Sequence, residues 1–340
     1  MNSKGQPFVS IVTPVWNGEA HIGECIESIL AQTHQNWEYI ILNNNSDDRT
    51  LEIAEAYRKR DSRIRVYSNT TFLSIIANHN KAFSLISAES RYCKVVSADD
   101  WILPECIERM VNLAEKNPSV GIVGAYQLSG GEGIWYLRNT GLPYSPSVVP
   151  GREVCRAHLL GALRVFGNPT SVMYRADLMR GADPFFPNDT MEADTSACLK
   201  HLRFSDFGFV HQVLAYERIH KVRASTTALD INSYTSAEIA DCQTYGEWYL
   251  SRQECDARIA ELLDAYYAYM AKCAFKRKGK QFWIYHIGRL HDLGLRLDVM
   301  RFAVGIASQL LDLTLHPRET IQMALTRMRI RRAHRGASLQ

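Results

Sequence analysis

The sequence lacks the cysteine patterns that would indicate a disulfide framework or a zinc site. Its eight cysteines are scattered over 340 residues, with no CxxC pair and no clustered spacing. Disulfide scaffolds are short and dense in cysteine, and structural zinc sites need closely spaced ligands. The pattern therefore predicts reduced, mostly buried thiols in a cytoplasmic protein.

Long apolar segments are also missing. The first twelve residues, MNSKGQPFVSIV, have neither the basic segment nor the apolar stretch of a signal peptide. The most apolar late segment, Phe302–Leu315, is interrupted by Gln309 and Asp312. Because spanning a bilayer takes about 20 apolar residues, we expect no transmembrane helix.

The chain has little net charge. Its 39 Lys+Arg and 36 Asp+Glu residues give +3, which is too small to argue for a nucleic-acid partner. Hydrophobic residues make up 46% of the sequence and charged residues 22%, as is usual for globular proteins. A length of 340 residues predicts a large main domain with an appendage.

Strand and helix signals alternate over the first 125 residues. Short apolar runs rich in β-branched residues predict strands, and apolar residues at helical spacing predict the helices between them. The predicted strands are Phe8–Thr13, Tyr39–Leu42, Ile64–Tyr67, Tyr92–Ser97 and Val120–Tyr126. Strands separated by helices imply right-handed crossovers and an α/β fold with a mostly parallel sheet.

In such a sheet, ligands bind beyond the carboxyl ends of the strands. Polar segments follow three of the predicted strands: Thr13–Glu19, Asn43–Asp48 and Ser97–Asp100. We expect these segments to converge on one site. No GxGxxG turn follows the first strand, which counts against a nicotinamide-binding Rossmann enzyme.

Two adjacent carboxylates, Asp99 and Asp100, follow the fourth predicted strand. They repel each other, and a divalent cation that bridges them to a diphosphate would relieve the repulsion with hard oxygen ligands. Such a metal would also neutralise charge on a leaving nucleoside diphosphate. Taken alone, the pair is explained equally well as an N-cap of the helix that contains Pro104 in its first turn.

Residues 8–57 resemble the start of the family 2 glycosyltransferases. In that family a first strand ends in a T-P-x-x-N-x-E-like stretch, a second in a D-D-x-S-x-D-x-T-like stretch, and a later strand in a DxD-type motif. All three occur here in that order, and the resemblance covers roughly residues 7–225. It implies a GT-A fold, Rossmann-like with flanking helices, and a metal-dependent, inverting glycosyltransferase.

The resemblance further implies a nucleotide-sugar pocket. Its members would be Thr13, Pro14, Glu19, Asn43, Asn44, Asn80, Lys81, Asp99 and Arg218. Glu19 would lie near the base or ribose, although a helix dipole also favours an acid at that place. Asn43 and Asn44 stand where the family usually has Asp, and since Asn both donates and accepts, the identity of the base stays open. For Asn80 and Lys81, a solvated helix face is the alternative.

The same resemblance assigns a divalent metal, Mn²⁺ or Mg²⁺, to Asp99, Asp100 and His220. Ser97 replaces the first Asp of the usual DxD motif, but the acidic pair that the family retains is present. Arg218 and His220 match an R-x-H element found near the diphosphate. In a β conformation they point to the same face, and Arg218 would bind phosphate or pair with a carboxylate.

The catalytic base implied by the resemblance is Asp194, with Glu192 as the fallback. A carboxylate deprotonates an acceptor hydroxyl when it lies within hydrogen-bond reach. An N-cap role for Asp194 stays open and does not exclude a catalytic one. One displacement with a base and no protein nucleophile implies inversion of configuration.

The rest of the chain is less informative. Residues 127–165 are rich in Gly and Pro, and we expect substrate-facing loops there. From about residue 231 the pattern is helical, so the predicted division is a catalytic domain at 1–226 and a helical region at 227–340. Its basic clusters, at 272–280 and 327–335, suit an anionic membrane surface on the cytoplasmic side. A solvated face, a tail, or dimerisation through aromatic-rich helices explains the same pattern.

The predicted function is transfer of a sugar from a nucleotide donor, with UDP-sugars favoured, to a saccharide or lipid-linked acceptor in cell-surface polysaccharide synthesis. The alternative is an inactive sugar-nucleotide-binding or scaffold protein. Ser97, Asn43 and Asn44 favour that alternative. The joint presence of Asp99, Asp100, Asp194 and His220 argues against it.

Overall fold

The computed structural model describes residues 5–131, 133–220 and 232–315. The chain divides into two compact units, one of residues 1–237 and 241–255, the other of residues 238–240 and 256–340. The predicted boundary at residue 226 lies outside the described residues. Each unit is considered by itself.

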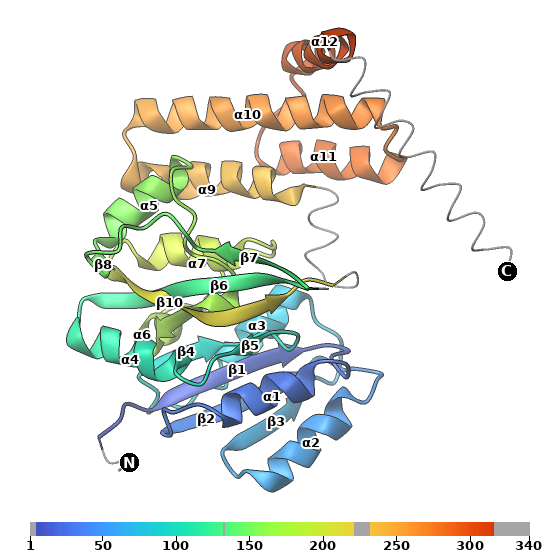
Figure 1. Ribbon diagram of the computed structural model, residues 1–340. Helices are drawn as coiled ribbons and strands as arrows, with labels where there is room; N and C mark the ends of the chain where they lie inside the picture. The colour runs from blue at the N-terminus through green and yellow to red at the C-terminus, as the bar shows by residue number, and fades with distance from the viewer. Residues whose placement is uncertain (1–4, 132, 221–231, 316–340) are drawn as a thin grey trace, which may run out of the picture. The chain divides into compact units, whose positions relative to one another are not determined.

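The described part of the first unit contains a ten-stranded sheet in the order β3-β2-β1-β4-β9-β6-β10-β5, with β7 paired to β6 and β8 to β10. The strands are β1 (Val9–Val15), β2 (Trp37–Asn43), β3 (Ile64–Ser68), β4 (Tyr92–Val95), β5 (Trp101–Ile102), β6 (Val120–Gly131), β7 (Ile134–Arg138), β8 (Val148–Val149), β9 (Val172–Arg175) and β10 (Asp206–Arg218). Neighbours from β3 to β4 run parallel, as do β6 and β10, whereas β9 is antiparallel to both β4 and β6. The predicted α/β architecture is confirmed (Figure 1).

Helices connect these strands. They are α1 (Ile22–Leu30), α2 (Thr50–Arg60), α3 (Ile75–Phe83), α4 (Cys106–Lys116), α5 (Gly151–Leu159), the 3-10 turn η1 (Pro169–Ser171), α6 (Ala176–Arg180), α7 (Ala193–His201) and α9 (Ser233–Tyr249). In α1, four of the five apolar residues that predicted the helix, Ile22, Cys25, Ile26 and Ile29, are buried, and Leu30 is partly buried. They share one face because helical neighbours recur every three to four residues. Strands β1 and β2 are buried along their whole length, as expected for parallel strands covered on both faces.

The expectation of loops over residues 127–165 is only partly right. Strand β6 continues to Gly131, and β7, β8 and α5 follow. A Cβ atom on Gly130 would come within 2.0 Å of the Ile134 carbonyl oxygen. Glycine here permits the close approach of two strands. Composition alone does not distinguish such a strand glycine from a loop glycine.

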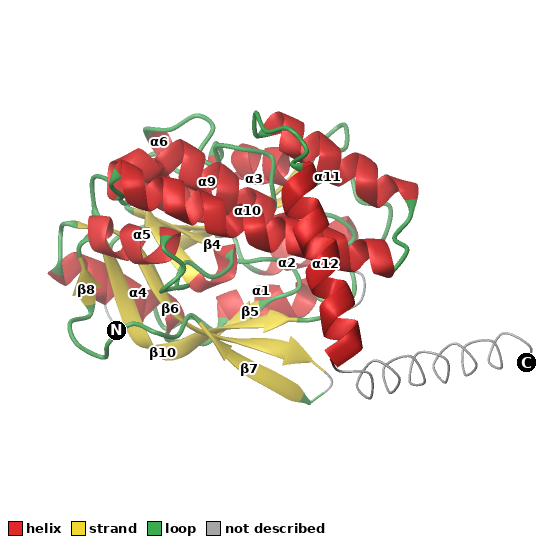
Figure 2. Cartoon of the chain, turned by 90° about the horizontal axis from the view of Figure 1, so that it is seen from above, coloured by secondary structure: helices red, strands yellow, loops and turns green. Residues whose placement is uncertain are grey.

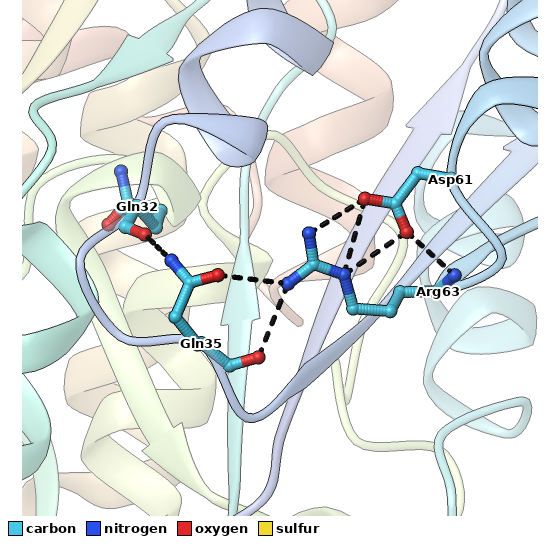
Figure 3. Close-up of polar contacts among 4 residues, drawn as sticks. All are labelled: Gln32, Gln35, Asp61 and Arg63. Carbon is cyan, nitrogen blue, oxygen red and sulfur yellow. Dashed lines mark hydrogen bonds and ion pairs between the residues drawn. The ribbon is translucent and has the colours of Figure 1, made fainter. Parts of the chain in front are cut away.

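A polar network fixes the amino-terminal end of β2 and β3 (Figure 3). Arg63 donates to both carboxylate oxygens of Asp61, with Nη2 to Oδ2 at 2.7 Å, and to the side chain and backbone oxygens of Gln35 at 3.3 Å. Gln35 in turn donates to the Gln32 carbonyl. The guanidinium also lies 3.6 Å from the centre of the Trp37 ring. These groups are mutually satisfied at the end of the sheet opposite the predicted site.

The second unit is helical in its described part, with most of α10 (Arg252–Phe275), α11 (Lys280–Asp292) and α12 (Val299–Leu315). Tyr266 and His286 are buried and share a 2.5 Å hydrogen bond, and the Tyr267 hydroxyl accepts from Asp298 N at 2.7 Å. None of the helices in the described ranges has the length and apolar character needed to cross a membrane. The basic cluster at 327–335 lies outside the described residues.

Candidate active site

The loops after β1 and β2 are linked to each other by hydrogen bonds. Glu19 N donates to Asp48 Oδ2 at 3.0 Å, and Glu19 Oε2 accepts from Arg49 N at 3.0 Å. Gly18 N donates to Thr50 Oγ1 at 2.7 Å. Glu19 thus accepts a hydrogen bond from the residue that precedes α2, where the helix dipole favours an acid. Its exposed carboxylate stays a predicted nucleotide contact.

Asn43 and Asn44, which stand where the family usually has Asp, belong to a buried polar network. Asn44 Oδ1 accepts from Leu73 N at 3.0 Å and from Asn69 Nδ2 at 2.9 Å, while Asn44 Nδ2 donates to Leu73 O at 2.9 Å. Asn69 Nδ2 also donates to Asn78 Oδ1 at 2.8 Å. Asn43 is equally buried and bonds to polar groups of two flanking segments. The side chains of Asn43 and Asn44 therefore hold these loops together from within.

Thr13 and Pro14 were predicted to line the pocket, but both are buried within β1. The Thr13 hydroxyl donates to Val96 O at 2.8 Å and accepts from the Tyr39 hydroxyl at 2.9 Å. With donor and acceptor both used inside the protein, this side chain ties β1 to the segment after β4.

Asn80 and Lys81, on α3, have different surroundings. The Asn80 amide makes two hydrogen bonds to the backbone of Phe186, donating to its carbonyl at 3.1 Å and accepting from its N–H at 2.9 Å. Asn80 thereby fixes the segment that leads to α7. Lys81 is exposed, so its predicted phosphate contact is compatible with its position.

Asp100 is buried and fully hydrogen-bonded. Its Oδ2 accepts from Thr170 Oγ1 at 2.6 Å and from Asn168 Nδ2 at 3.4 Å, and its Oδ1 accepts from Arg218 N at 3.1 Å. Burial, reinforced by the neighbouring charge of Asp99, raises the pKa of Asp100 well above the ordinary value. Helix α4 begins only at Cys106, after Glu105 at its N-cap position, so the acidic pair does not cap that helix.

Asp99 points to the other members of the predicted metal site. Its Oδ2 lies 3.0 Å from His220 Nε2, and its backbone oxygen accepts from Arg218 Nε at 3.3 Å. Arg218 also pairs with Glu24 of α1 and lies 4.7 Å from the centre of the Trp101 ring. The structure therefore brings Asp99 together with Arg218 and His220, which lie about 120 residues later in the sequence.

Lys94 is a supporting residue that the sequence analysis missed. It is completely buried in β4, and its Nζ donates to Val172 O at 3.0 Å and to Thr170 O. Burial lowers the pKa of Lys94. The lysine holds η1 so that Thr170 can donate to Asp100. A lysine inside an otherwise apolar strand was the available signal, because buried lysines are rare without a partner.

Asp194 lies in the first turn of α7, directly after the N-cap residue Glu192 and Ala193. Its Oδ1 accepts from Thr195 N at 2.8 Å. Burial raises the pKa of Asp194 to about 7, and the charge of Glu217 contributes in the same direction. A carboxylate with that pKa is suited to accept a proton near neutral pH.

Glu217 is a second residue that the sequence analysis missed. It accepts from Gln127 Nε2 at 2.8 Å and from Ser129 Oγ at 2.5 Å. Its charge acts on both Asp100 and Asp194, which places the predicted base and the acidic pair in one neighbourhood. Glu217 stands between Tyr216 and Arg218, but nothing in the sequence showed which of the two faces of the strand the site uses.

The residues at this edge fit a metal that shares its ligands with a substrate. In the part of the chain that the structure describes, no group of three or more His, Cys, Asp or Glu side chains could hold a metal ion. Asp99 and His220 are 3.0 Å apart, and their side chains are 32% and 29% exposed. Mg²⁺ is usually bound by one or two carboxylates together with substrate phosphates and water, and such a partial ligand set is what Asp99 and His220 offer.

Comparison with known protein families identifies the family of the chain. The family model of Glycosyl transferase family 2 matches residues 10–179. An uncharacterized glycosyltransferase of Haemophilus influenzae is 37% identical over 120 residues, which cover 35% of this chain and 36% of that protein. The uncharacterized glycosyltransferase EpsJ of Bacillus subtilis is 32% identical over 199 residues, covering 56% of this chain and 54% of that protein. The chain thus spans about a third to a half of the length of these relatives.

Solved structures share the fold. Residues 1–349 of S. aureus TarS in complex with UDP-GlcNAc match with a TM-score of 0.62 at 18% identity, covering 85% of this chain and 80% of that one. The mannosyltransferase PcManGT from Pyrobaculum calidifontis, in complex with GDP-Man and Mn²⁺, matches with a TM-score of 0.51 at 15% identity, covering 90% and 88%. At these identities the likeness concerns the fold. The chain belongs to glycosyl transferase family 2 and is a glycosyltransferase with the GT-A fold.

Proposed function

We propose that the protein transfers a sugar from a nucleotide donor, with UDP-sugars preferred, to a saccharide or lipid-linked acceptor, and that it inverts the anomeric configuration. The observation that carries the proposal is the crowding of carboxylates at the carboxyl ends of the strands. The Glu217 charge acts on both Asp100 and Asp194, and Asp99 is in contact with His220 beside Arg218. Such a site needs a cationic ligand and offers a base.

Each charged side chain has a separate part in the proposed reaction. Asp99 and His220, with Asp100 as the third predicted ligand, would hold Mn²⁺ or Mg²⁺ against the diphosphate, and that ion would neutralise the charge of the leaving group. Arg218 is placed to bind a phosphate oxygen beside them. Asp194 would accept the proton of the acceptor hydroxyl as that oxygen attacks the anomeric carbon. One displacement without a protein nucleophile inverts the configuration.

The preference for a UDP-sugar rests on the TarS complexes with UDP and UDP-GlcNAc, and PcManGT with GDP-Man makes GDP-sugars the main competitor. The amides of Asn43 and Asn44 are engaged within the protein. We therefore expect the base to be recognised by backbone groups and exposed side chains such as Glu19.

A thermal-shift screen against UDP-, GDP-, dTDP- and CMP-sugars, with and without Mn²⁺, tests the donor assignment. Binding stabilises the folded state by an amount that grows with the logarithm of the ratio of ligand concentration to Kd, so we expect the largest shift for UDP-sugars, and only when Mn²⁺ is present. The variant Asp99→Asn should lose the Mn²⁺-dependent part. Equal shifts with and without Mn²⁺ would refute the metal role, and a larger shift with GDP-sugars would refute the preference for UDP.

We also propose that the second unit contacts an anionic membrane surface, as an enzyme that uses a lipid-linked acceptor would require. Residues 256–340 contain 15 Lys+Arg and 7 Asp+Glu. On α12, Met300, Val304, Leu311 and Leu315 are exposed at spacings that place them along one side of the helix. Basic and apolar side chains together favour anionic bilayers.

Co-sedimentation with vesicles of mixed neutral and anionic lipid tests this contact. The full chain should bind anionic vesicles at low salt and release at high salt. A chain ending at residue 320 and the double variant Met300→Ser/Val304→Ser should bind more weakly. A full chain that stays in the supernatant at low salt would refute the membrane contact.

A further inference from the structure

Strand β7 is unusual because it is an outer strand with four consecutive exposed apolar side chains. Ile134, Trp135, Tyr136 and Leu137 are 59%, 38%, 56% and 49% exposed. Exposed, apolar edge strands invite aggregation and are normally avoided. Where they persist, such patches mark binding sites, so we expect a ligand or partner to bind to this strand.

One face of β7 is fixed to the sheet. Trp135 pairs with Gly130 of β6, and its ring packs edge-on against Trp101 at 5.9 Å and Tyr216 at 5.6 Å between centroids. Trp101 and Tyr216 are stacked, 4.9 Å apart at an interplanar angle of 5°, and they are register partners of β5 and β10. Trp135 therefore anchors the β6–β7 hairpin, which can be followed in Figure 2.

The other face of β7 continues across β6 to Glu217 of β10. Successive side chains of a strand alternate between faces, so Tyr136 and Ile134 lie opposite to Trp135. Tyr136 pairs with Ser129 of β6, and side chains of opposed residues share a face. The Ser129 hydroxyl donates to Glu217 at 2.5 Å, and the Glu217 charge reaches the predicted base Asp194.

We propose that Tyr136, with Ile134 beside it, forms one wall of the acceptor subsite and binds a pyranose ring of a saccharide acceptor by stacking. This inference rests on the proposed function and narrows its acceptor to a sugar at the reacting end. A pyranose has an apolar C–H face that packs on an aromatic ring, and polar hydroxyl groups around its rim. Pockets for such ligands combine aromatic walls with a few placed polar groups, and here the half-buried Glu217 carboxylate, held by the buried Ser129 and Gln127 side chains, supplies a polar group.

The hairpin is built to hold this wall still. The close approach at Gly130 leaves no room for a side chain there, and the Trp135 anchor fixes the register. A one-residue slip would exchange the faces of Trp135 and Tyr136. The anchored and the binding side chains are thus adjacent in the sequence but perform different tasks.

The test compares Tyr136→Ala with Tyr136→Phe, which keeps the ring, and with Tyr144→Ala, which removes a tyrosine that is 82% exposed and lies beside His211. Two rates are measured on the full chain with Mn²⁺: release of nucleoside diphosphate without acceptor, and transfer to a panel of methyl glycosides. Loss of an aromatic stacking contact is worth about tenfold in affinity. Tyr136→Ala should therefore raise KM for the glycoside about tenfold and leave acceptor-free release within about twofold.

Tyr136→Phe and Tyr144→Ala should match the wild type in both rates. An unchanged glycoside KM in Tyr136→Ala would overturn the inference while leaving the proposed function intact. A wild type that releases nucleoside diphosphate but transfers to none of the glycosides would also overturn the inference. A concentration-dependent dimer that Tyr136→Ala abolishes would overturn it as well, since a second copy would then occupy β7. A wild type inactive in both assays would contradict the proposed function itself.

Discussion

The two halves of the catalytic edge differ in how their polar groups are satisfied. Beyond β1 to β3, Asn44 uses its side-chain donor and acceptor on Asn69 and on the backbone of Leu73, and in this network only the buried Asn69 Oδ1 has no hydrogen-bond partner in the described structure. Beyond β4 and β10, burial raises the pKa of Asp100 well above its ordinary value, and the neighbouring charges of Asp99 and Glu217 add to that shift. The first half is held together mainly by hydrogen bonds within the protein, whereas we propose that a cation stabilises the second half.

This difference suggests that the amides position the nucleotide-side loops, whereas the carboxylates take part in the reaction. A satisfied amide network resists deformation, because an unpaired buried amide is costly, and it can hold the nucleotide-side loops in one arrangement. Crowded carboxylates are unfavourable in the free protein, and strongly shifted groups of this kind cluster at functional sites. Changes in the two halves should therefore have different consequences.

Replacement of the base should have the largest effect. In Asp194→Asn the carboxylate that would accept the acceptor proton is gone, so transfer should fall by about 10²- to 10⁴-fold. The donor Kd, measured by calorimetry with Mn²⁺, should stay within about twofold. Glu192→Gln is the matched control on the same helix terminus and should retain most activity. Normal turnover in Asp194→Asn would remove Asp194 as the base.

Loss of the metal should come next. With Asp99 and His220 as its protein ligands, the ion should be removable, so EDTA should abolish transfer and added Mn²⁺ should restore it. Asp99→Asn should need more Mn²⁺ for half-maximal rate, by at least about tenfold, because a charged ligand has been lost. Full activity in EDTA would contradict this part of the account.

On the amide side, Asn44→Asp should affect stability more than chemistry. The substitution restores the family's usual acid but replaces an N–H donor to the Leu73 carbonyl with an oxygen. Such a mismatch costs about 1–3 kcal/mol of unfolding free energy, which urea denaturation can measure. The pH dependence of transfer should not move. A variant of unchanged stability would show that the network tolerates charge.

The pH dependence should show the crowding of carboxylates directly. Because the pKa of Asp194 is raised to about 7, the basic form is present above that pH and is lost below it, so kcat/KM should fall about tenfold per pH unit on the acid side. Glu217→Gln removes a charge that raises this pKa, so the acid limb should move to lower pH. If the acid limb of the pH profile stays in place, the charge of Glu217 does not affect the pKa of Asp194.

Much of this edge was predictable from the sequence, because strand order brings the segments after β1, β2 and β4 together whatever their side chains do. The orientation of single residues was harder. Thr13 shares its face with Val9, Ile11 and Val15, which pack in the core, so strict alternation along the strand would have placed it inside. The resemblance of its motif to a family pattern pointed the other way.

Other features depend on contacts between distant residues. The buried Lys94 is explained only by its hydrogen bond to the Thr170 carbonyl of η1. Glu217 is held by Gln127 and Ser129, about 90 residues earlier in the sequence. The hairpin of β6 and β7 was hidden by glycines that look like loop residues. Nothing local in the sequence encodes these partners, since each requires the sheet order.

Release of nucleoside diphosphate from a panel of sugar nucleotides with Mn²⁺, compared between the wild type and Asp194→Asn, tests the central claim most directly. The account predicts release by the wild type from at least one donor, its loss in EDTA, and a decrease of about 100-fold or more in Asp194→Asn with donor binding retained. Donor binding by a wild type that releases no nucleoside diphosphate, with or without acceptor, would contradict it. That result would instead identify a sugar-nucleotide-binding protein without catalytic activity.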